Sequence, residues 1–159
     1  MIRDPSAHDG IVELRADAEV RTLLADAGLP VADLDGPDAP TLFGMRRAGV
    51  LVAVVGVERH GAAGLLRSLA VAPDARGLGF AGILVYAAEH WAADQGIATL
   101  YLLTQTAEAF FARRGYLRLA RERAPPAIAA TTQFAGLCPG TAAFMAKALP
   151  APRRRPGRP

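Results

Sequence analysis

The segment "ARGLGFAG" at 75–82 has the residue types and spacing that bind phosphate groups. Gly77, Gly79 and Gly82 form the G-x-G-x-x-G spacing of dinucleotide-binding turns, while Arg76 opens an overlapping R-x-x-G-x-A spacing. In both patterns glycine lets backbone N–H groups approach a phosphate, and a helix that begins near Gly79 directs its positive end toward the anion. Arg76 adds a bidentate donor. The segment therefore predicts a pyrophosphate site.

The residues around this segment disfavour a dinucleotide as the ligand. A dinucleotide turn needs a strand that runs directly into the first glycine, and an acidic residue at the end of the next strand for the ribose. Here "APDAR" separates the apolar segment from Gly77, and the next predicted strand ends in "YLLTQT" without an acid. A Walker-type loop is disfavoured as well, because neither Lys-Ser nor Lys-Thr follows the glycines.

Three polar residues in otherwise apolar segments are candidates for substrate chemistry. Glu58 is a carboxylate that can take a proton from an amine, although an exposed charge at a strand end is the simpler interpretation. Arg67 either grips a substrate carboxylate, or pairs with Glu58, or does both. Ser68 lies on the opposite face from Arg67 if the strand alternates, and a buried hydroxyl bonded to backbone explains it best.

Hydrophobic periodicity and turn residues predict the elements that position these groups. Asp17 is a candidate N-cap for the first helix. The order of elements, strands first and then strands alternating with helices, indicates a three-layer α/β or α+β domain with one mixed sheet. Strands are predicted at 11–15, 41–49, 50–60, 65–72, 97–103, 116–120 and 141–149, and helices at 18–28, 81–96, 106–115 and 125–134.

Composition favours one globular domain over a nucleic-acid-binding protein. The 159 residues are 52% hydrophobic and 21% charged, which suits a single folded domain. We expect a loose extension at 1–10, a domain at 11–149 and a disordered Pro/Arg tail at 150–159, which either aids solubility or contacts an acidic partner. The tail carries four of the 18 basic residues. The rest of the chain therefore has 14 basic and 15 acidic residues, so the domain itself is not basic.

The cysteine and histidine positions and the short apolar segments predict a cytoplasmic protein that has neither a metal site nor a membrane segment. Cys138 is the single cysteine, so no internal disulfide forms, as in a reducing compartment. The longest apolar runs, such as "VLVAVV", are too short to cross a bilayer. His8, His60 and His90 form no ligand spacing with Cys138. Cys138 is interpreted as a small buried hydrophobe, a catalytic thiol or a soft ligand for trivalent arsenic.

The segment "LLRSLAVAPDARGLGFAGILV" resembles the central motif of the GNAT N-acetyltransferase superfamily. In that motif a strand ends in Leu-x-Val-x-Pro, and R-x-x-G-x-G/A opens the following helix. Residues 69–73 and 76–81 match both parts, and "TQTAEAFFARRGY" is similar to the superfamily's second CoA motif. The resemblance implies the GNAT fold, an α/β (α+β) domain over 11–149. Its single mixed, mostly antiparallel sheet has a splayed central strand pair and helices on both faces.

The resemblance also implies acetyl-CoA as cosubstrate and direct acetyl transfer to a small amine. The 69–71 strand would pair with the pantetheine arm, and the thioester would lie in the splay between the strands at 65–71 and 97–103. A homodimer through the C-terminal strand is common in such folds. The residues that the resemblance assigns to acetyl-CoA are Leu69, Ala70, Val71, Arg76, Gly77, Leu78, Gly79, Phe80, Ala81, Gly82, Thr104 and Phe111.

The sequence departs from the superfamily where the leaving thiolate would be protonated. Many members have a Tyr four residues before the Gly of the second motif, and here that residue is Phe111. The Asn common at the start of that motif is Thr104. Tyr116, Tyr101 or solvent is left to supply the proton, although both tyrosines are better explained as core or strand residues.

A narrower resemblance links the chain to N-acetyltransferases encoded beside arsenic-resistance genes. Its most distinctive part is "QFAGLCP" at 133–139. It implies that the acceptor is an amino-acid-like organoarsenical or phosphinic acid, that the role is detoxification, and that Gln133, Phe134 and Cys138 border the acceptor pocket together with Arg67. Glu58, Arg67 and Ser68 are the catalytic candidates. The alternatives are a CoA-binding sensor without turnover, favoured by Phe111, and a protein-amine acetyltransferase.

Overall fold

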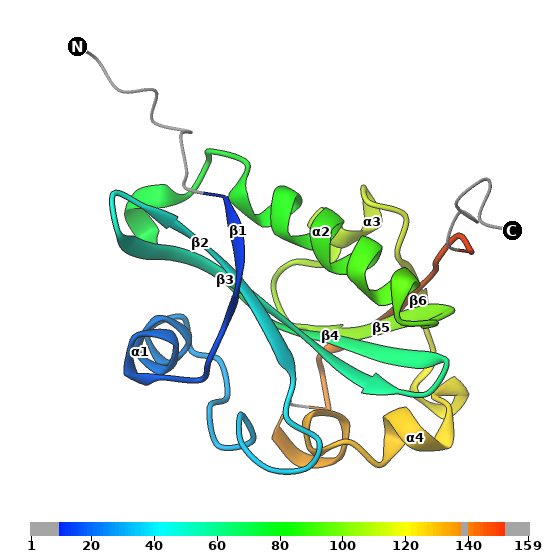
Figure 1. Cartoon of the computed structure of the whole chain (residues 1–159). Coiled ribbons are helices and arrows are strands. Elements are labelled where there is room, and N and C mark those ends of the chain that lie inside the picture. The colour runs from blue at the N-terminus through cyan, green and yellow to red at the C-terminus, as the bar shows by residue number, and fades with distance from the viewer. Residues whose placement is uncertain (1–9, 138–139, 152–159) are drawn as a thin grey trace, which may run out of the picture.

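The computed structural model describes residues 10–137 and 140–151, which build a seven-stranded sheet with helices on both faces (Figure 1). The strand order is β1-β2-β3-β4-β5-β7-β6. All neighbouring strands in this order are antiparallel except β4 and β5. The strands are β1 Ile11–Leu14, β2 Thr41–Arg47, β3 Val50–His60, β4 Ala63–Val71, β5 Thr99–Thr104, β6 Leu117–Leu119 and β7 Ala143–Ala148.

Two helices cover each face of the sheet. Helix α2 (Phe80–Asp94) and the short α3 (Glu108–Ala112) pack on one face, in a core that includes Leu84 and Phe111. Helix α1 (Ala18–Asp26) and α4 (Pro126–Ala129) cover the other face, where they form two smaller cores. Because both faces are covered, β3 is buried over nearly its whole length, as the unbroken apolar run at 50–57 within it predicts.

Local sequence signals explain where the helices begin. The side chain of Asp17 caps α1 by accepting a hydrogen bond from the backbone N–H of Val20 at 3.0 Å, which confirms the predicted N-cap. Helix α2 begins after Gly79, whose φ of +87° lies in the left-handed region that glycine adopts without strain. A 3₁₀ turn, η1 (Pro73–Ala75), joins β4 to this glycine turn.

The central strands β4 and β5 diverge, as the GNAT resemblance predicted. Their parallel pairing covers only Ala63–Leu65 opposite Thr99–Tyr101. Beyond these residues β4 continues to Val71 and β5 continues to Thr104 without further pairing to each other. The far side of β5 pairs with β7 instead. The splay therefore opens a space between the two strands within the sheet.

A β-bulge in β4 corrects the predicted orientation of Ser68. The register passes from Val54 opposite Ala70 to Gly56 opposite Arg67, so one β3 residue faces two β4 residues. Ser68 is one of these two, with a φ of +57°. Its hydroxyl oxygen accepts a hydrogen bond from Arg67 Nε at 3.1 Å. The prediction of opposite faces was wrong because the extra residue breaks the two-residue alternation of the strand.

The helix predicted at 125–134 is not continuous, which is a second correction. Helix α4 ends at Ala129, and a π-helical turn, η3 (Gln133–Leu137), follows. Between them the hydroxyl of Thr131 donates to the carbonyl of Ile128 at 2.7 Å and accepts from the N–H of Phe134 at 3.3 Å. This side chain replaces backbone bonds of a continuous helix. A further 3₁₀ turn, η2 (Arg121–Arg123), precedes α4.

No helix among residues 10–137 and 140–151 is long and apolar enough to cross a membrane. Most of the predicted extension at 1–10 and tail at 150–159 lies outside these residues.

Candidate active site

A cavity of about 290 Å³ opens where β4 and β5 diverge. The loop after α1, β4, the end of β5, the turn that follows it, and α3 all contribute to its wall. Six residues singled out from the sequence line this one cavity. They are Arg67, Ser68, Leu69, Thr104, Phe111 and Gln133. The splay is also the place that the resemblance predicted for the thioester.

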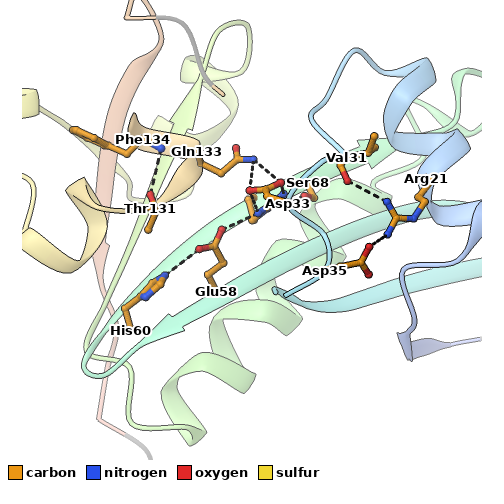
Figure 2. A network of polar contacts seen from close by, with 11 residues as sticks. Arg21, Val31, Asp33, Asp35, Glu58, His60, Ser68, Thr131, Gln133 and Phe134 are labelled. Carbon is orange, nitrogen blue, oxygen red and sulfur yellow. Dashed lines mark hydrogen bonds and ion pairs between the residues drawn. The ribbon is translucent and has the colours of Figure 1, made fainter. Parts of the chain in front are cut away.

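Figure 2 shows Asp33, Glu58 and Ser68 close together, and the side chain of Arg67 forms hydrogen bonds with all three. Its Nη1 atom donates to Glu58 Oε2 at 2.8 Å and to Asp33 Oδ2 at 2.6 Å, and its Nη2 atom donates to Asp33 Oδ1 at 2.5 Å. Only 2% of this side chain is exposed. The pairing of Arg67 with Glu58, one of the options that the sequence left open, is therefore present. A second carboxylate joins it.

Glu58 is buried rather than an exposed charge at a strand end. The side chain is 4% exposed, and its second oxygen, Oε1, lies 3.0 Å from His60 Nε2. Glu58 and His60 are two residues apart on β3, so their side chains lie on the same face of the strand. His60 was not predicted as a site residue, although this spacing was a signal for it. Glu58 itself lies behind Arg67 and does not line the cavity.

Asp33 is the residue that sequence reasoning missed most completely. It lies in the loop between α1 and β2, 34 positions from Arg67, in a stretch rich in Pro, Gly and Asp that reads as an ordinary surface loop. Burial raises the pKa of Asp33, but the hydrogen bonds and charge of Arg67 outweigh that effect and hold the pKa below its ordinary value. Asp33 is therefore ionised at neutral pH.

The predicted phosphate turn has room for a ligand. Gly77 and Gly79 have φ values of +78° and +87°, and a Cβ built at either position meets no atom within 4 Å. The turn leads into the first turn of the 15-residue helix α2, whose N-terminal end attracts anions. Arg76 is exposed beside this turn, and its Nε atom donates to the carbonyl of Val71 at 3.3 Å. An open turn at a helix N-terminus fits a pyrophosphate.

A second arginine, not singled out from the sequence, approaches the same helix end. A Cβ at Gly82 would lie 2.7 Å from Arg114 Nη2, so the absence of a side chain at Gly82 lets this guanidinium lie against α2. Arg114 also stacks over the ring of Phe110, with 3.7 Å from Cζ to the ring centroid. It is placed by its bond to the carbonyl of Phe110 at 3.1 Å. Arg114 therefore adds positive charge near the phosphate turn.

Phe111 contributes a phenyl ring to the cavity wall near α3, at the position where the resemblance leads one to expect a tyrosine. Phe111 is 5% exposed and packs edge-on against Phe110 and Tyr116. The phenol of Tyr116 does not line the cavity, because it donates to Glu89 Oε2 at 3.0 Å. Burial and the Glu89 charge raise the pKa of Tyr116 well above its ordinary value. Tyr101 stacks on Phe144 and is also absent from the cavity wall.

The remaining predicted residues divide between the cavity and its surroundings. Gln133 lines the cavity and directs its Nε2 atom at both oxygens of Asp33, at 3.3 and 3.5 Å. Phe134 packs edge-on against Phe144, outside the cavity wall. Cys138 lies outside the described residues. Within the described ranges, no group of three or more His, Cys, Asp or Glu side chains is arranged to hold a metal ion.

Comparison with known proteins adds a family and a set of similar folds. The model of the acetyltransferase (GNAT) family matches residues 10–116. No curated protein matches the chain. A putative acyl-CoA N-acyltransferase from Klebsiella pneumoniae is 23% identical, with a TM-score of 0.71, and the match covers 91% of this chain and 99% of that one.

Two similar solved structures contain coenzyme A. N-acetylglutamate synthase from Neisseria gonorrhoeae, complexed with coenzyme A and N-acetyl-glutamate, is 16% identical with a TM-score of 0.69 over 90% of this chain. This chain spans only 36% of that protein's length. The PaiA N-acetyltransferase from Thermoplasma acidophilum, in complex with coenzyme A, is 13% identical with a TM-score of 0.62, over 87% of this chain and 98% of that one.

Proposed function

Because the chain belongs to the GNAT acetyltransferase family, we propose that it transfers the acetyl group of acetyl-CoA to a primary amine of a small molecule. One observation carries this proposal. The cavity is lined by residues 65–69, where the pairing of β4 with β5 ends, and the open glycine turn at the start of α2 follows the end of the same strand. This arrangement offers one site for a pyrophosphate and another for a thioester.

The chain's own residues fit acetyl-CoA in three places. Backbone N–H groups around Gly77 and Gly79 would hold the pyrophosphate, with positive charge from Arg76 and Arg114 nearby. Past its pairing with β5, β4 leaves backbone groups near Leu69 without a strand partner on that side, and an extended pantetheine arm would pair with them. The coenzyme A in two similar solved structures supports this assignment.

The chemistry requires that the amine lose a proton. An alkyl ammonium has a pKa near ~10.4, so at neutral pH a base must remove the proton before nitrogen attacks. We assign that step to Glu58, acting through a water molecule because Arg67 stands between its carboxylate and the cavity. The amine nitrogen then bonds to the carbonyl carbon and loses its second proton to solvent. The carbon–sulfur bond breaks, which leaves the amide, and the thiolate takes a proton from solvent. We assign to His60, whose Nε2 atom lies 3.0 Å from Glu58 Oε1, the transfer of the first proton from Glu58 to solvent.

For the acceptor, we propose an amino-acid-like organoarsenical or phosphinic acid, with a role in arsenic resistance. The resemblance of 133–139 to enzymes from arsenic-resistance operons supports this choice. The position of Gln133 and Arg67 in the cavity wall supports it as well, because both side chains donate hydrogen bonds to acid groups.

A CoA-binding module without turnover is the alternative function, favoured by Phe111. The cavity wall has a phenyl ring where the superfamily usually has a proton donor. Calorimetric titration with acetyl-CoA, together with an assay of thiol release over a panel of amines, separates the two functions. Binding with release supports transfer, binding without release supports the module, and the absence of binding contradicts both.

A further inference from the structure

The carboxylate of Asp33 lies in a clamp of donors that come from distant parts of the chain. Arg67 on β4 holds its two oxygens with two different nitrogens, at 2.5 and 2.6 Å, which is the bidentate arrangement of arginine with a planar carboxylate. The amide Nε2 of Gln133, on η3, approaches the same two oxygens at 3.5 and 3.3 Å. Arg67 and Gln133 both line the cavity, and Asp33 lies next to the cavity wall without lining it. Two cavity-wall donors thus converge on one carboxylate.

The clamp lies beside the proposed base. The Nη1 atom of Arg67 donates both to Asp33 Oδ2 and to Glu58 Oε2, so a single nitrogen separates the two carboxylates. An α-amino acid carries its amine one carbon from its carboxylate. A carboxylate bound where that of Asp33 now lies would therefore hold an α-amine close to Glu58 and to the splay.

The loop around Asp33 has anchors that do not involve the Asp33 side chain. On either side of Asp33 the loop is anchored by Arg21, which donates to the carbonyl of Val31 at 3.2 Å and pairs with Asp35 at 2.5 Å (Figure 2). Leu34 is buried against α1. The side chain of Asp33 is 13% exposed, so solvent reaches it in the clamp. An incoming carboxylate would keep Arg67 paired, which avoids an uncompensated buried charge.

We propose that Asp33 occupies the subsite that receives the α-carboxylate of the acceptor, and that an amino-acid-like acceptor displaces it from Arg67 and Gln133. This inference rests on the proposed acetyl transfer and adds which residues receive the carboxylate of its amino-acid-like acceptor. Asp33 thereby acts as a specificity-determining residue, because an acceptor must compete with it for the clamp. An amine without a carboxylate leaves Asp33 in place and gains nothing from the clamp.

The test compares Asp33→Asn with wild type on two acceptors that differ in one group. One is phosphinothricin, an amino-acid-like phosphinic acid, and the other is its decarboxylated analogue. We expect Asp33→Asn to lower KM for phosphinothricin about tenfold, because the internal competitor loses its charge and its bidentate bond. KM for the decarboxylated analogue should change less than twofold. Asp38→Asn is the matched control, since Asp38 lies on the same loop, is exposed and is not one of the residues that anchor it.

Calorimetric titration of both variants with phosphinothricin separates this inference from the proposed function. Tighter binding of phosphinothricin to Asp33→Asn than to wild type supports the clamp. If no acetyl transfer accompanies that tighter binding, the clamp is still supported but the proposed acetyltransferase function is contradicted. In Asp33→Asn combined with Gln133→Leu the gain should shrink. Equal or weaker binding of phosphinothricin to Asp33→Asn overturns the proposal, as does an equal change for both acceptors or no binding at all. Thermal unfolding establishes that each variant is folded.

Discussion

Glu58 Oε2 and Arg67 Nη1 lie 2.8 Å apart on the neighbouring strands β3 and β4, and both side chains are almost completely excluded from solvent. Ion pairs buried this deeply stabilise a fold only while both partners remain, because each charge lost its hydration on folding. Loss of either partner would therefore leave a buried charge unpaired, and Arg67 connects this pair to the cavity wall.

Replacing Arg67 with Met should destabilise the protein strongly. The substitution keeps most of the side-chain volume but leaves Glu58 and Asp33 as buried carboxylates without their shared cation. The expected loss in the free energy of unfolding is about 3–5 kcal/mol. Urea denaturation measures it. Arg46→Met, which removes an arginine paired with Glu19 near the surface, should cost less than about 1 kcal/mol. Equal losses would contradict the buried-pair account.

Glu58→Gln should abolish most of the transfer activity without weakening acetyl-CoA binding. The amide keeps the shape of the side chain, but it has far too low a basicity to accept the amine proton. Loss of a general base typically lowers kcat by about a hundredfold to ten-thousandfold. Steady-state kinetics at several pH values, together with titration of acetyl-CoA, check both parts. A fall in kcat of less than threefold would remove Glu58 from the role of base.

Gly79→Leu should remove acetyl-CoA binding and leave the protein folded. A side chain at this position projects into the space proposed for the pyrophosphate, and a φ of +87° adds some backbone strain. Gly96→Leu controls for that strain, because Gly96 has the same φ of +87° and open surroundings, and it follows the C-terminal end of α2, away from the phosphate segment. Calorimetry should detect binding to the control alone. Binding to both variants would exclude this turn as the pyrophosphate site.

Phe111→Tyr should raise kcat, since it places a phenol in the cavity wall where the superfamily carries its general acid. A positioned acid is expected to add about tenfold or more when thiolate departure limits the rate. Phe110→Tyr is the matched control, because Phe110 precedes it on α3 but does not line the cavity. An unchanged kcat in Phe111→Tyr would mean that solvent already protonates the thiolate fast enough.

The bond of Asp33 to Arg67 should make part of the stability depend on pH. Because the pKa of Asp33 is lowered in the folded state, its contribution is complete above the ordinary aspartate pKa of about 3.9 and is lost as pH falls through the folded value. The difference in unfolding free energy between wild type and Asp33→Asn should therefore be constant near neutral pH and shrink in acid. A difference that grows in acid would contradict the sign of the shift.

Much of the fold follows from local sequence signals. The Asp17 cap, the glycine turn before α2 and the continuous apolar run of β3 each depend on residues within a few positions of one another. The β4–β5 splay was anticipated only through the resemblance to a family. The bulge at Ser68 was missed because the register of β4 against β3 depends on pairing between strands, which alternation within one strand does not reveal.

The candidate site was predictable in part. Arg67 and Glu58 stand out as charges in apolar strands, and that contrast is visible in the sequence. His60 carried a weaker signal, its two-residue spacing from Glu58. Asp33 carried none, because the loop after α1 reaches Arg67 only through the tertiary fold. Arg114 was missed for the same reason. It follows α3 in the chain and lies against Gly82 of α2 only in the folded structure.

Mass spectrometry of the acceptor after incubation with acetyl-CoA tests the central claim most directly. We predict that phosphinothricin or another small primary amine gains one acetyl group, that one free thiol appears for each acetyl group transferred, and that Glu58→Gln suppresses both signals together. Acetyl-CoA that binds to the wild-type protein but acetylates no amine in the panel would contradict the claim, and the CoA-binding module would then be the better account of the protein.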